Sequence, residues 1–279
     1  MGSSTGKAIR LGRVLDPSDG RAAVVALDHG LHLGPVPGAI DVSATLNALT
    51  RAGADAFLVS PGLAQAFPSV FVGKGAPGLI LRVDWTNRWR AADQLGSDEG
   101  RGRMIARAED AARLGADAVL AYVFLGYEDP DAEARQVEDV AHLVWDCDRL
   151  GIGCILEPMP RGRRADHDSY RAEHIALAAR IACELGADVL KTDYSGGADS
   201  FRQVTAASFR PVLIAGGPRV STDREFLSMV AGAMTAGAQG VFIGRNLFQA
   251  PDPGSLMRAV RTMVHEGLGV DGALAQLGS

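Results

Sequence analysis

A short pattern that recurs along the chain constrains its fold more than any other feature. In each copy an amphipathic stretch reaches a glycine, a small residue follows, and an apolar run begins. A glycine at that point is typical of the left-handed residue that ends a helix, so each copy indicates a helix, a tight turn and a buried strand. Four close copies and a looser fifth are found at residues 52–60, 114–122, 185–193 and 236–244, and at 150–157.

The repeats belong to a longer series of strands and helices. The apolar runs are short and have no polar face, which is typical of parallel strands covered by helices. Eight strands at roughly 30-residue spacing favour a closed (β/α)8 barrel over an open doubly wound sheet. The strands are predicted to begin near Ala22, Ala54, Gly78, Asp117, Gly153, Asp188, Pro211 and Gly240. Helices are predicted at 42–52, 104–114, 131–149, 168–185, 199–207, 222–236 and 254–266, and more weakly at 60–72.

We therefore predict a single TIM-barrel domain over residues 1–279. The length fits a fold of roughly 250 residues, and neither a linker nor a change in composition divides the chain. Three segments are predicted to lie outside the repeating pattern: a disordered lead at 1–8, an extended loop after the third strand at 85–103, and a frayed tail from about 267 to 279.

Composition excludes several classes of partner. A net charge of −5 and an isoelectric point of 5.7 carry no basic footprint, so we expect no nucleic acid. The absence of an 18-residue apolar run argues against a membrane span, and residues 1–7 lack the apolar core of a signal peptide. Three cysteines without a C-x-x-C pair are expected to be core thiols of a cytoplasmic protein.

One lysine lies inside an apolar strand. The chain has three lysines, and Lys7 and Lys74 occur among glycines in segments predicted as loops, whereas Lys191 lies in the sixth strand. An ammonium removed from water is unfavourable unless it is paired or its pKa falls, and a lysine whose pKa falls becomes a nucleophile able to form a Schiff base. The alternative is a strand-end lysine that reaches solvent or pairs with Asp193.

The carboxyl ends of the predicted strands carry the other candidate residues. Active sites of (β/α)8 barrels lie at these ends. The candidates there are Asp28, Ser60, Asp84, Glu157, Lys191 and Asp193. A lysine can add to a carbonyl while carboxylates transfer protons, so these residues favour carbonyl chemistry. Ser60 and Asp193 are included as substrate-binding candidates.

Glycines after the last two strands predict a phosphate site. Gly216, Gly217 and Gly244 leave backbone amides unshielded, and Arg245 adds a guanidinium fork. The loops after strands seven and eight of such barrels frequently bind phosphate. Glycines are also common at strand ends, so it is their combination with Arg245 at both expected strands that favours phosphate.

Several motifs together resemble a known family. The chain is similar to the class I aldolases that include archaeal-type fructose-bisphosphate aldolases, aminodideoxyheptulosonate synthases, deoxyribose-phosphate and tagatose-bisphosphate aldolases, and the autoinducer-processing thiolase. The matching pieces run from the first strand to the eighth: Leu27-Asp28-His29-Gly30, Pro160-Arg161-Gly162, Val189-Leu190-Lys191-Thr192, Ile214-Ala215-Gly216-Gly217 and Gly244-Arg245-Asn246-Leu247-Phe248-Gln249.

The resemblance implies a cofactor-free, metal-independent Schiff-base aldolase of the cytoplasm, in a homo-oligomer, acting on a phosphorylated ketose or dihydroxyacetone phosphate. It implies that Lys191 forms the Schiff base, that Asp28 handles the substrate hydroxyl and protons, and that Gly217, Gly244 and Arg245 bind phosphate. Alternatives within the fold are an aminodideoxyheptulosonate-type synthase, a transaldolase-like enzyme and a thiolase-like acyl transferase. A non-catalytic sugar-phosphate sensor is the alternative outside enzymes.

One position departs from the family. Archaeal-type aldolases carry a proton-transferring tyrosine before Pro-Arg-Gly, whereas this chain has Met159. Glu157 lies two residues earlier and projects to the same side of the strand. It matches the position at which tagatose-bisphosphate and sulfofructose-phosphate aldolases carry a catalytic glutamate, so we predict that Glu157 transfers the proton. Alternatively, Arg161 or Lys191 neutralises it and Tyr122 or Tyr127 donates the proton.

Two histidines raise the question of a metal. His29 and His32 are three residues apart after the first strand. A metal site needs three or four convergent ligands, and no further histidine is predicted at another strand end. We therefore expect no metal and assign these histidines to packing or to support of the catalytic residues.

Overall fold

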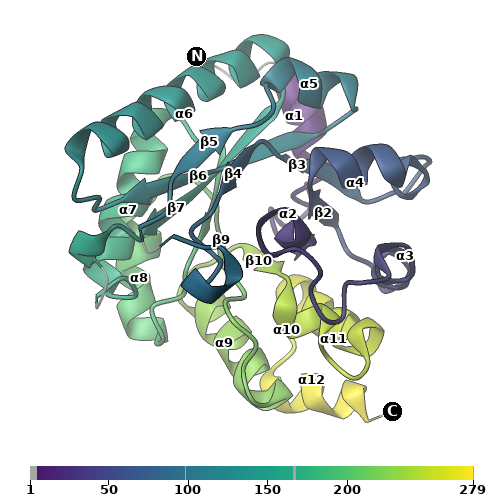
Figure 1. Cartoon of the computed structure of the whole chain (residues 1–279). Helices are drawn as coiled ribbons and strands as arrows, with labels where there is room; N and C mark the ends of the chain where they lie inside the picture. Colours follow the sequence, from purple (N-terminus) through teal and green to yellow (C-terminus); the bar gives the residue numbers. More distant parts are fainter. Residues whose placement is uncertain (1–4, 98, 166–167, 279) are drawn as a thin grey trace.

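The computed structural model describes residues 5–97, 99–165 and 168–278. Eight parallel strands close into a barrel (Figure 1), which confirms the predicted (β/α)8 architecture. Around the barrel the order is β1, β2, β3, β6, β7, β8, β9 and β10, and β10 pairs with β1. Their bounds are Ala22–Ala26, Ala56–Val59, Gly78–Arg82, Ala118–Leu125, Gly153–Pro160, Val189–Thr192, Val212–Ala215 and Gly240–Ile243.

Helices surround the barrel close to the predicted ranges. They are α3 (Val42–Arg51), α4 (Pro61–Ala66), α5 (Ala108–Arg113), α6 (Pro130–Leu150), α7 (Ala172–Leu185), α8 (Ala198–Ala207), α9 (Asp223–Thr235) and α11 (Pro253–Glu266). The repeated glycines Gly53, Gly115, Gly186 and Gly237 all have positive φ, between 77° and 104°. This left-handed backbone favours glycine and explains the repeat. The weak helix predicted at 60–72 is divided at Pro68, which begins a separate 3-10 turn (Pro68–Phe71).

Three predictions about irregular segments were wrong. The segment 85–103 contains a hairpin rather than a plain loop: β4 (Asp84–Thr86) pairs antiparallel with β5 (Gly102–Met104), and a 3-10 turn (Ala92–Gln94) lies between them. The segment from 270 forms a helix, α12 (Val270–Leu277), because it packs against α9 and α11 and buries Ala273. Residues 5–8 belong to the helix α1 (Thr5–Leu11), while residues 1–4 of the predicted lead lie outside the described residues.

The assignment of Lys7 to a loop was also wrong. Lys7 lies in α1 and is only 2% exposed. Its Nζ contacts Asp148 of α6 and lies 2.8 Å from Asp188, immediately before β8. The two carboxylates allow this ammonium to be buried. Lys191 is therefore not the only buried lysine of the chain.

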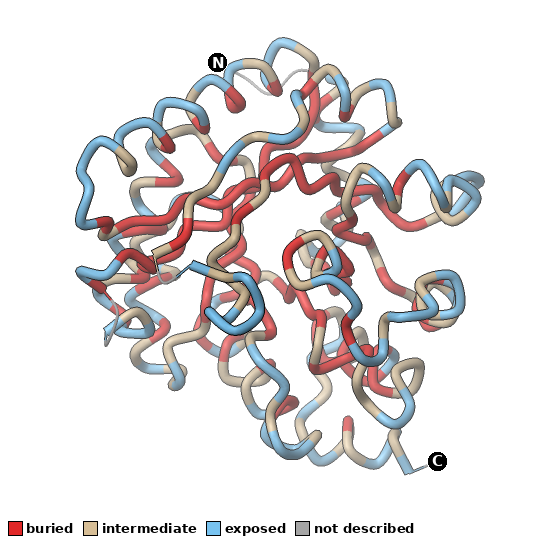
Figure 2. Tube along the Cα trace, in the orientation of Figure 1, coloured by how far each residue is buried: buried red, intermediate tan, exposed pale blue. Residues whose placement is uncertain are grey.

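Two apolar layers frame the barrel, and the strands between them are buried (red in Figure 2). One lies between the strands and the helices, and the other fills the barrel interior toward its amino-terminal end. Val24, Leu58, Ile80, Leu120 and Phe242 belong to the interior layer, and Val14, which precedes β1 in the chain, packs in the same layer. Polar side chains then occupy the interior above this layer, where the strands end. The described residues form no helix that is long and apolar enough to span a membrane.

Candidate active site

A cavity of about 270 Å³ opens at the carboxyl ends of the strands. Polar and charged residues from most strand ends line it: Asp28, His29, His32, Trp89, Tyr122, Glu157, Arg161, Tyr170, Lys191, Asp193, Gly216, Gly217, Gly244 and Arg245. Ala26, Leu33, Met159, Ala215, Pro218 and Phe242 complete the lining. A larger cavity of about 550 Å³ lies at the amino-terminal ends, among Arg13, Arg51, Arg258 and Arg261, and has no lysine in its lining.

Lys191 lies on the floor of the smaller cavity. It is near the end of β8, and strand alternation turns it inward with Val189, which joins the interior layer, while Leu190 faces the helices. The Lys191 side chain is 8% exposed, and its Nζ lies 2.8 Å from Glu157 Oε1. The Nζ also lies 5.6 Å from the centre of the Phe242 ring. A buried amine beside one carboxylate, with open space above it, can react with a bound carbonyl.

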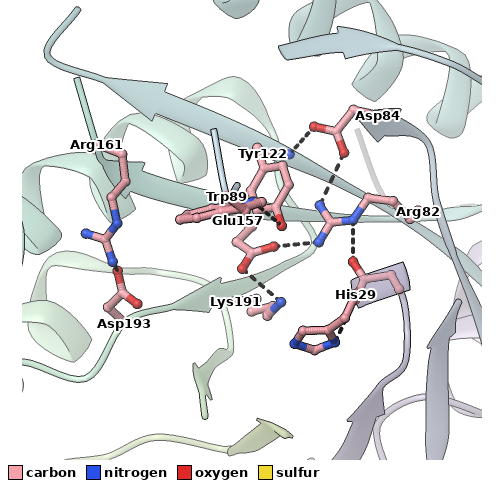
Figure 3. Close-up of polar contacts among 10 residues, drawn as sticks. His29, Arg82, Asp84, Trp89, Tyr122, Glu157, Arg161, Lys191 and Asp193 are labelled. Carbon is pink, nitrogen blue, oxygen red and sulfur yellow. Dashed lines mark hydrogen bonds and ion pairs between the residues drawn. The ribbon is translucent and has the colours of Figure 1, made fainter. Parts of the chain in front are cut away.

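An arginine that we did not predict holds the carboxylates around Lys191 (Figure 3). Arg82, the last residue of β3, is fully buried. Its Nη2 donates to Glu157 Oε2 at 2.8 Å, and its Nε donates to Asp28 Oδ2 at 2.7 Å. Its Nη1 donates to Asp84 Oδ1 at 3.2 Å. Each partner is a strand-end carboxylate that the sequence pattern had identified.

Arg82 controls the charge of Asp28. Burial by itself would raise the pKa of Asp28, but the guanidinium of Arg82 and the ammonium of Lys191 hold that pKa well below its usual range. Asp28 is therefore ionised at neutral pH. For Asp84 the balance is different: burial dominates and raises its pKa to about 6, although Arg82 and the Tyr122 amide oppose this rise.

Tyr122 forms one wall of the cavity beside Arg82. Its ring lies 3.9 Å from the Arg82 guanidinium carbon, which is a stacked cation–π contact. Trp89, from the segment between β4 and β5, donates its Nε1 proton to Tyr122 Oη at 3.1 Å. Burial raises the pKa of Tyr122 well above its usual range, so this phenol stays protonated. Tyr127, the other alternative proton donor, does not line the cavity among the described residues.

Asp193 pairs with Arg161 rather than with Lys191. The Arg161 Nη2 donates to Asp193 Oδ2 at 2.5 Å. Burial raises the pKa of Asp193, and Arg161 opposes the rise. The second nitrogen of the fork, Arg161 Nη1, is buried without a hydrogen-bond partner in the described part of the chain. The predicted alternative in which Arg161 neutralises Glu157 is thus wrong, whereas Lys191 does contact Glu157.

The predicted phosphate residues gather on one side of the cavity. Gly217 has a φ of +65°, and Arg245 begins a short helix, α10 (Arg245–Phe248). A Cβ on Gly244 would lie 2.2 Å from His29 Cε1, so any other residue there would displace the His29 ring. The Nε of Arg245 is buried and has no hydrogen-bond partner among the described residues. An oxyanion could satisfy it.

Asn246 fixes this side of the cavity and was not recognised from the sequence. Its Nδ2 donates to the carbonyl oxygens of Gly216 at 2.6 Å and Pro218 at 2.9 Å. Its Oδ1 accepts from the Val220 amide at 2.9 Å. Asn246 therefore ties the loop after β9 to the end of β10. Its place beside Arg245 in the matching motif was the available signal.

Ser60 lies outside this cavity. Its Oγ accepts the Leu63 amide proton at 3.3 Å and caps α4, as a serine before a helix commonly does. Ser60 lines a neighbouring apolar cavity instead. Ser60 apart, the residues predicted to form the Schiff base, transfer the proton at Glu157 and Asp28, or bind substrate all line the cavity, whereas Asp84 is connected to it through Arg82.

His29 and His32 line the cavity from the short helix α2 (His29–Leu33). Burial lowers the pKa of each to about 4, so both are neutral at physiological pH. His32 Nδ1 lies 3.3 Å from the Thr86 carbonyl oxygen. Within the described residues, the histidine and acidic groups that converge as metal ligands would are Asp16, Asp19 and His265, near the amino-terminal ends of the strands.

Comparisons with known proteins agree with this arrangement. The family model of the DeoC/LacD aldolases matches residues 22–250. A 2-amino-3,7-dideoxy-D-threo-hept-6-ulosonate synthase of Halobacterium salinarum is 39% identical and covers 99% of this chain and 98% of that protein. An uncharacterized aldolase of Saccharolobus solfataricus is 37% identical, and the match covers 96% of this chain and 98% of that protein.

A solved structure is similar over nearly the same length. It is an archaeal fructose-1,6-bisphosphate aldolase with its catalytic lysine covalently bound to the carbinolamine intermediate of the substrate. Its TM-score is 0.79 at 28% identity, over 92% of this chain and 99% of that one. From the family match and the two relatives above 30% identity, it follows that this chain belongs to the DeoC/LacD family of aldolases.

Proposed function

We propose that this protein is a class I aldolase that makes or breaks a carbon–carbon bond of a phosphorylated ketose through a Schiff base on Lys191. The observation that carries the proposal is the contact of 2.8 Å between Lys191 Nζ and Glu157 Oε1 on the floor of the cavity. A carboxylate at that distance can accept the proton that the ammonium must lose before it becomes a nucleophile.

The proposed reaction begins with transfer of a proton from Lys191 Nζ to Glu157 Oε1. The freed electron pair of Nζ forms a bond to the carbonyl carbon, and the nitrogen loses a second proton as the carbonyl oxygen gains one, giving a carbinolamine. Glu157 returns its proton to the hydroxyl, which leaves as water, and an iminium remains. The iminium withdraws electrons while the carbon–carbon bond breaks, and Asp28 accepts the proton of the substrate hydroxyl.

Glu157 is the proposed substitute for the family tyrosine. Met159 also lines the cavity, but a thioether cannot exchange protons at neutral pH. The phenol of Tyr122 already accepts a hydrogen bond from Trp89, and its raised pKa makes it a poor acid. These two observations favour Glu157 over the tyrosines.

The proposed phosphate position is the side formed by Gly216, Gly217, Gly244 and Arg245. The unpartnered Arg245 Nε supports it, because a buried donor without an acceptor is unfavourable. A dihydroxyacetone-phosphate donor could then extend from these residues toward Lys191. This reaction uses no metal, so activity should persist in EDTA. The expected cytoplasmic location and homo-oligomer stay predictions.

The test separates Schiff-base formation from turnover. Glu157→Gln should lower kcat by about 10³-fold, because proton transfer commonly contributes 10²–10⁴-fold. Because Glu157 also acts in the steps that form the iminium, borohydride should still trap substrate on Lys191 in this variant but more slowly, seen as an added mass on the peptide that contains Lys191. Full turnover in Glu157→Gln would refute the role of Glu157. The absence of any adduct in the unmodified enzyme would instead favour the sugar-phosphate sensor.

A synthase is the second candidate, and the pair Arg161–Asp193 favours it. Asp193 already neutralises part of the Arg161 charge, and Arg161 Nη1 has no hydrogen-bond partner within the described ranges. Such a pair suits a carboxylate beside an ammonium better than the second dianion of a bisphosphate. The product named for the Halobacterium relative carries an amino group and a carboxylate. If borohydride captures that compound on Lys191 and not fructose 1,6-bisphosphate, the synthase assignment holds; the reverse supports the ketose aldolase.

A further inference from the structure

We infer that Arg82 is a positioning residue that binds one oxygen of each reacting carboxylate and leaves the other oxygen of each for chemistry. This inference rests on the proposed function of Lys191, Glu157 and Asp28. Nothing in the sequence pattern pointed to Arg82, since a guanidinium at a strand end is more commonly exposed than buried.

The Arg82 guanidinium is held in place by contacts on its edge and on its face. Its nitrogens are committed to Asp28, Asp84 and Glu157, and its face lies on the Tyr122 ring. Asp84 holds Arg82 from behind, because Asp84 Oδ2 also accepts the Tyr122 amide proton at 2.8 Å. This second bond ties the start of β4 to β6. A planar fork held on its edge and its face has one orientation.

In that orientation, Arg82 contacts one oxygen of Glu157 and one oxygen of Asp28 and leaves the second oxygen of each carboxylate to other partners. In Glu157, Oε2 accepts from Arg82 Nη2 at 2.8 Å, so Oε1 faces Lys191 Nζ at 2.8 Å. In Asp28, Oδ2 accepts a hydrogen bond from Arg82 Nε at 2.7 Å. The other oxygen, Oδ1, lies 3.9 Å from Nδ1 of His29, a residue that lines the cavity. Each catalytic carboxylate therefore has one anchored oxygen and one oxygen available to Lys191 or to substrate.

The charge of Arg82 matters as much as its shape. Asp28, Asp84 and Glu157 converge on it, and in the described part of the chain Lys191 is the other cation paired with one of these carboxylates. When Lys191 gives up its proton, Arg82 remains as the cation that stabilises the carboxylates. The other titratable groups around it are Tyr122, His29 and His32. These three are neutral at physiological pH and cannot replace it.

Two substitutions test this role. Arg82→Lys keeps a positive charge but loses the fork, and should lower kcat at least about 10-fold because one ammonium cannot hold both carboxylates at these angles. Arg82→Met removes the charge and should lower kcat by about 10³-fold. In Arg82→Met, the acidic limb of the kcat–pH profile should move to higher pH, since Asp28 loses the cation that depresses its pKa. In Arg82→Lys the limb should move in the same direction by a smaller amount, because the positive charge stays but no longer lies as close to Asp28. KM should change little, because Arg82 does not line the cavity.

The controls separate positioning from folding and from the proposed function. Thermal unfolding of Arg82→Lys shows whether the variant is folded; this variant is decisive if Arg82→Met fails to fold. A folded Arg82→Lys with unchanged kcat and an unchanged acidic limb overturns the inference, as does a loss confined to KM. If the unmodified enzyme forms no borohydride adduct, the proposed function fails and the role of Arg82 fails with it. If the adduct forms and only the pH profiles disagree, the inference about Arg82 fails alone.

Discussion

Two buried lysines lie at opposite ends of the same strand. Lys7 packs where β8 begins, against Asp188 and Asp148. Lys191 lies three residues farther along the chain than Asp188, where β8 ends, and its direct ion-pair partner among the described residues is Glu157. Both side chains are almost fully buried. Burial alone therefore does not distinguish a structural lysine from a reactive one.

The surroundings distinguish them. Burial by itself would lower the pKa of Lys7, but its two aspartates raise that pKa, so Lys7 is a permanent cation. Lys7 lines none of the three cavities described above. Glu157 shares its charge with Arg82, and open space lies above Lys191. A reactive lysine needs a neighbouring carboxylate that can accept its proton, as Glu157 can, and it needs open space in which a carbonyl can bind.

The largest expected effect is on activity. Lys191→Met should lower kcat/KM by at least about 10⁴-fold and abolish the borohydride adduct, because the nucleophile is lost. Its free energy of unfolding should change by about 1 kcal/mol or less, since Arg82 still holds Glu157. Steady-state kinetics, mass measurement and urea unfolding give the three values. Residual turnover within 100-fold of the unmodified enzyme would contradict the assignment.

Lys7→Met should show the opposite behaviour. Removing one partner of a buried ion pair typically costs about 3–5 kcal/mol, and here two aspartates lose their cation, so we expect about 3 kcal/mol less stability. The kcat of the folded fraction should be unchanged. Lys74→Met is the matched control, because Lys74 is exposed and should affect neither property. If Lys7→Met is as stable as the control, the comparison of the two lysines is wrong.

The histidines at the two ends of the barrel differ in the direction of their pKa shifts. At the amino-terminal end, His265 lies between Asp55 and Asp19, with both nitrogens at 2.8 Å from a carboxylate oxygen, and Asp55 in particular raises the pKa of His265. At the carboxyl end, burial lowers the pKa of His29 and His32 to about 4. The same residue type is thus favoured as a cation at one end and as a neutral ring at the other.

His265→Gln should therefore destabilise the protein in a pH-dependent way. Because the folded-state pKa is raised, the stabilisation is fully present below the unfolded value of about 6.5 and is lost as the pH rises through the higher folded value. We expect a loss of about 1 kcal/mol near pH 6, limited by solvent screening, that shrinks toward pH 9. Melting temperatures of both proteins at the two pH values measure it. A difference that grows with pH would reverse the sign and refute the ion pair.

The repeat and the strand-end residues could be predicted from the sequence, because both depend on residues that are close together in the chain. A glycine after a helix requires a left-handed backbone whatever its distant neighbours, so Gly53, Gly115, Gly186 and Gly237 marked four of the units. Alternation along β7 and β8 likewise fixes that Glu157 and Lys191 face inward. The placement of Ser60 failed for the same reason: a serine that caps the following helix and a serine that faces the cavity look alike in sequence.

The barrel, the strand ends and the buried position of Lys191 could be predicted from the residue pattern, because each depends on periodicity within a few residues. Which charged groups pair with one another depends instead on the folded arrangement of distant segments. Arg82 contacts Asp28 and Glu157 across 54 and 75 residues of chain, and Lys7 contacts Asp148 across 141. Those pairings arise when the barrel closes and brings distant strands together. Because the dielectric constant inside the barrel is low, the charge state of each buried group then depends strongly on its partner.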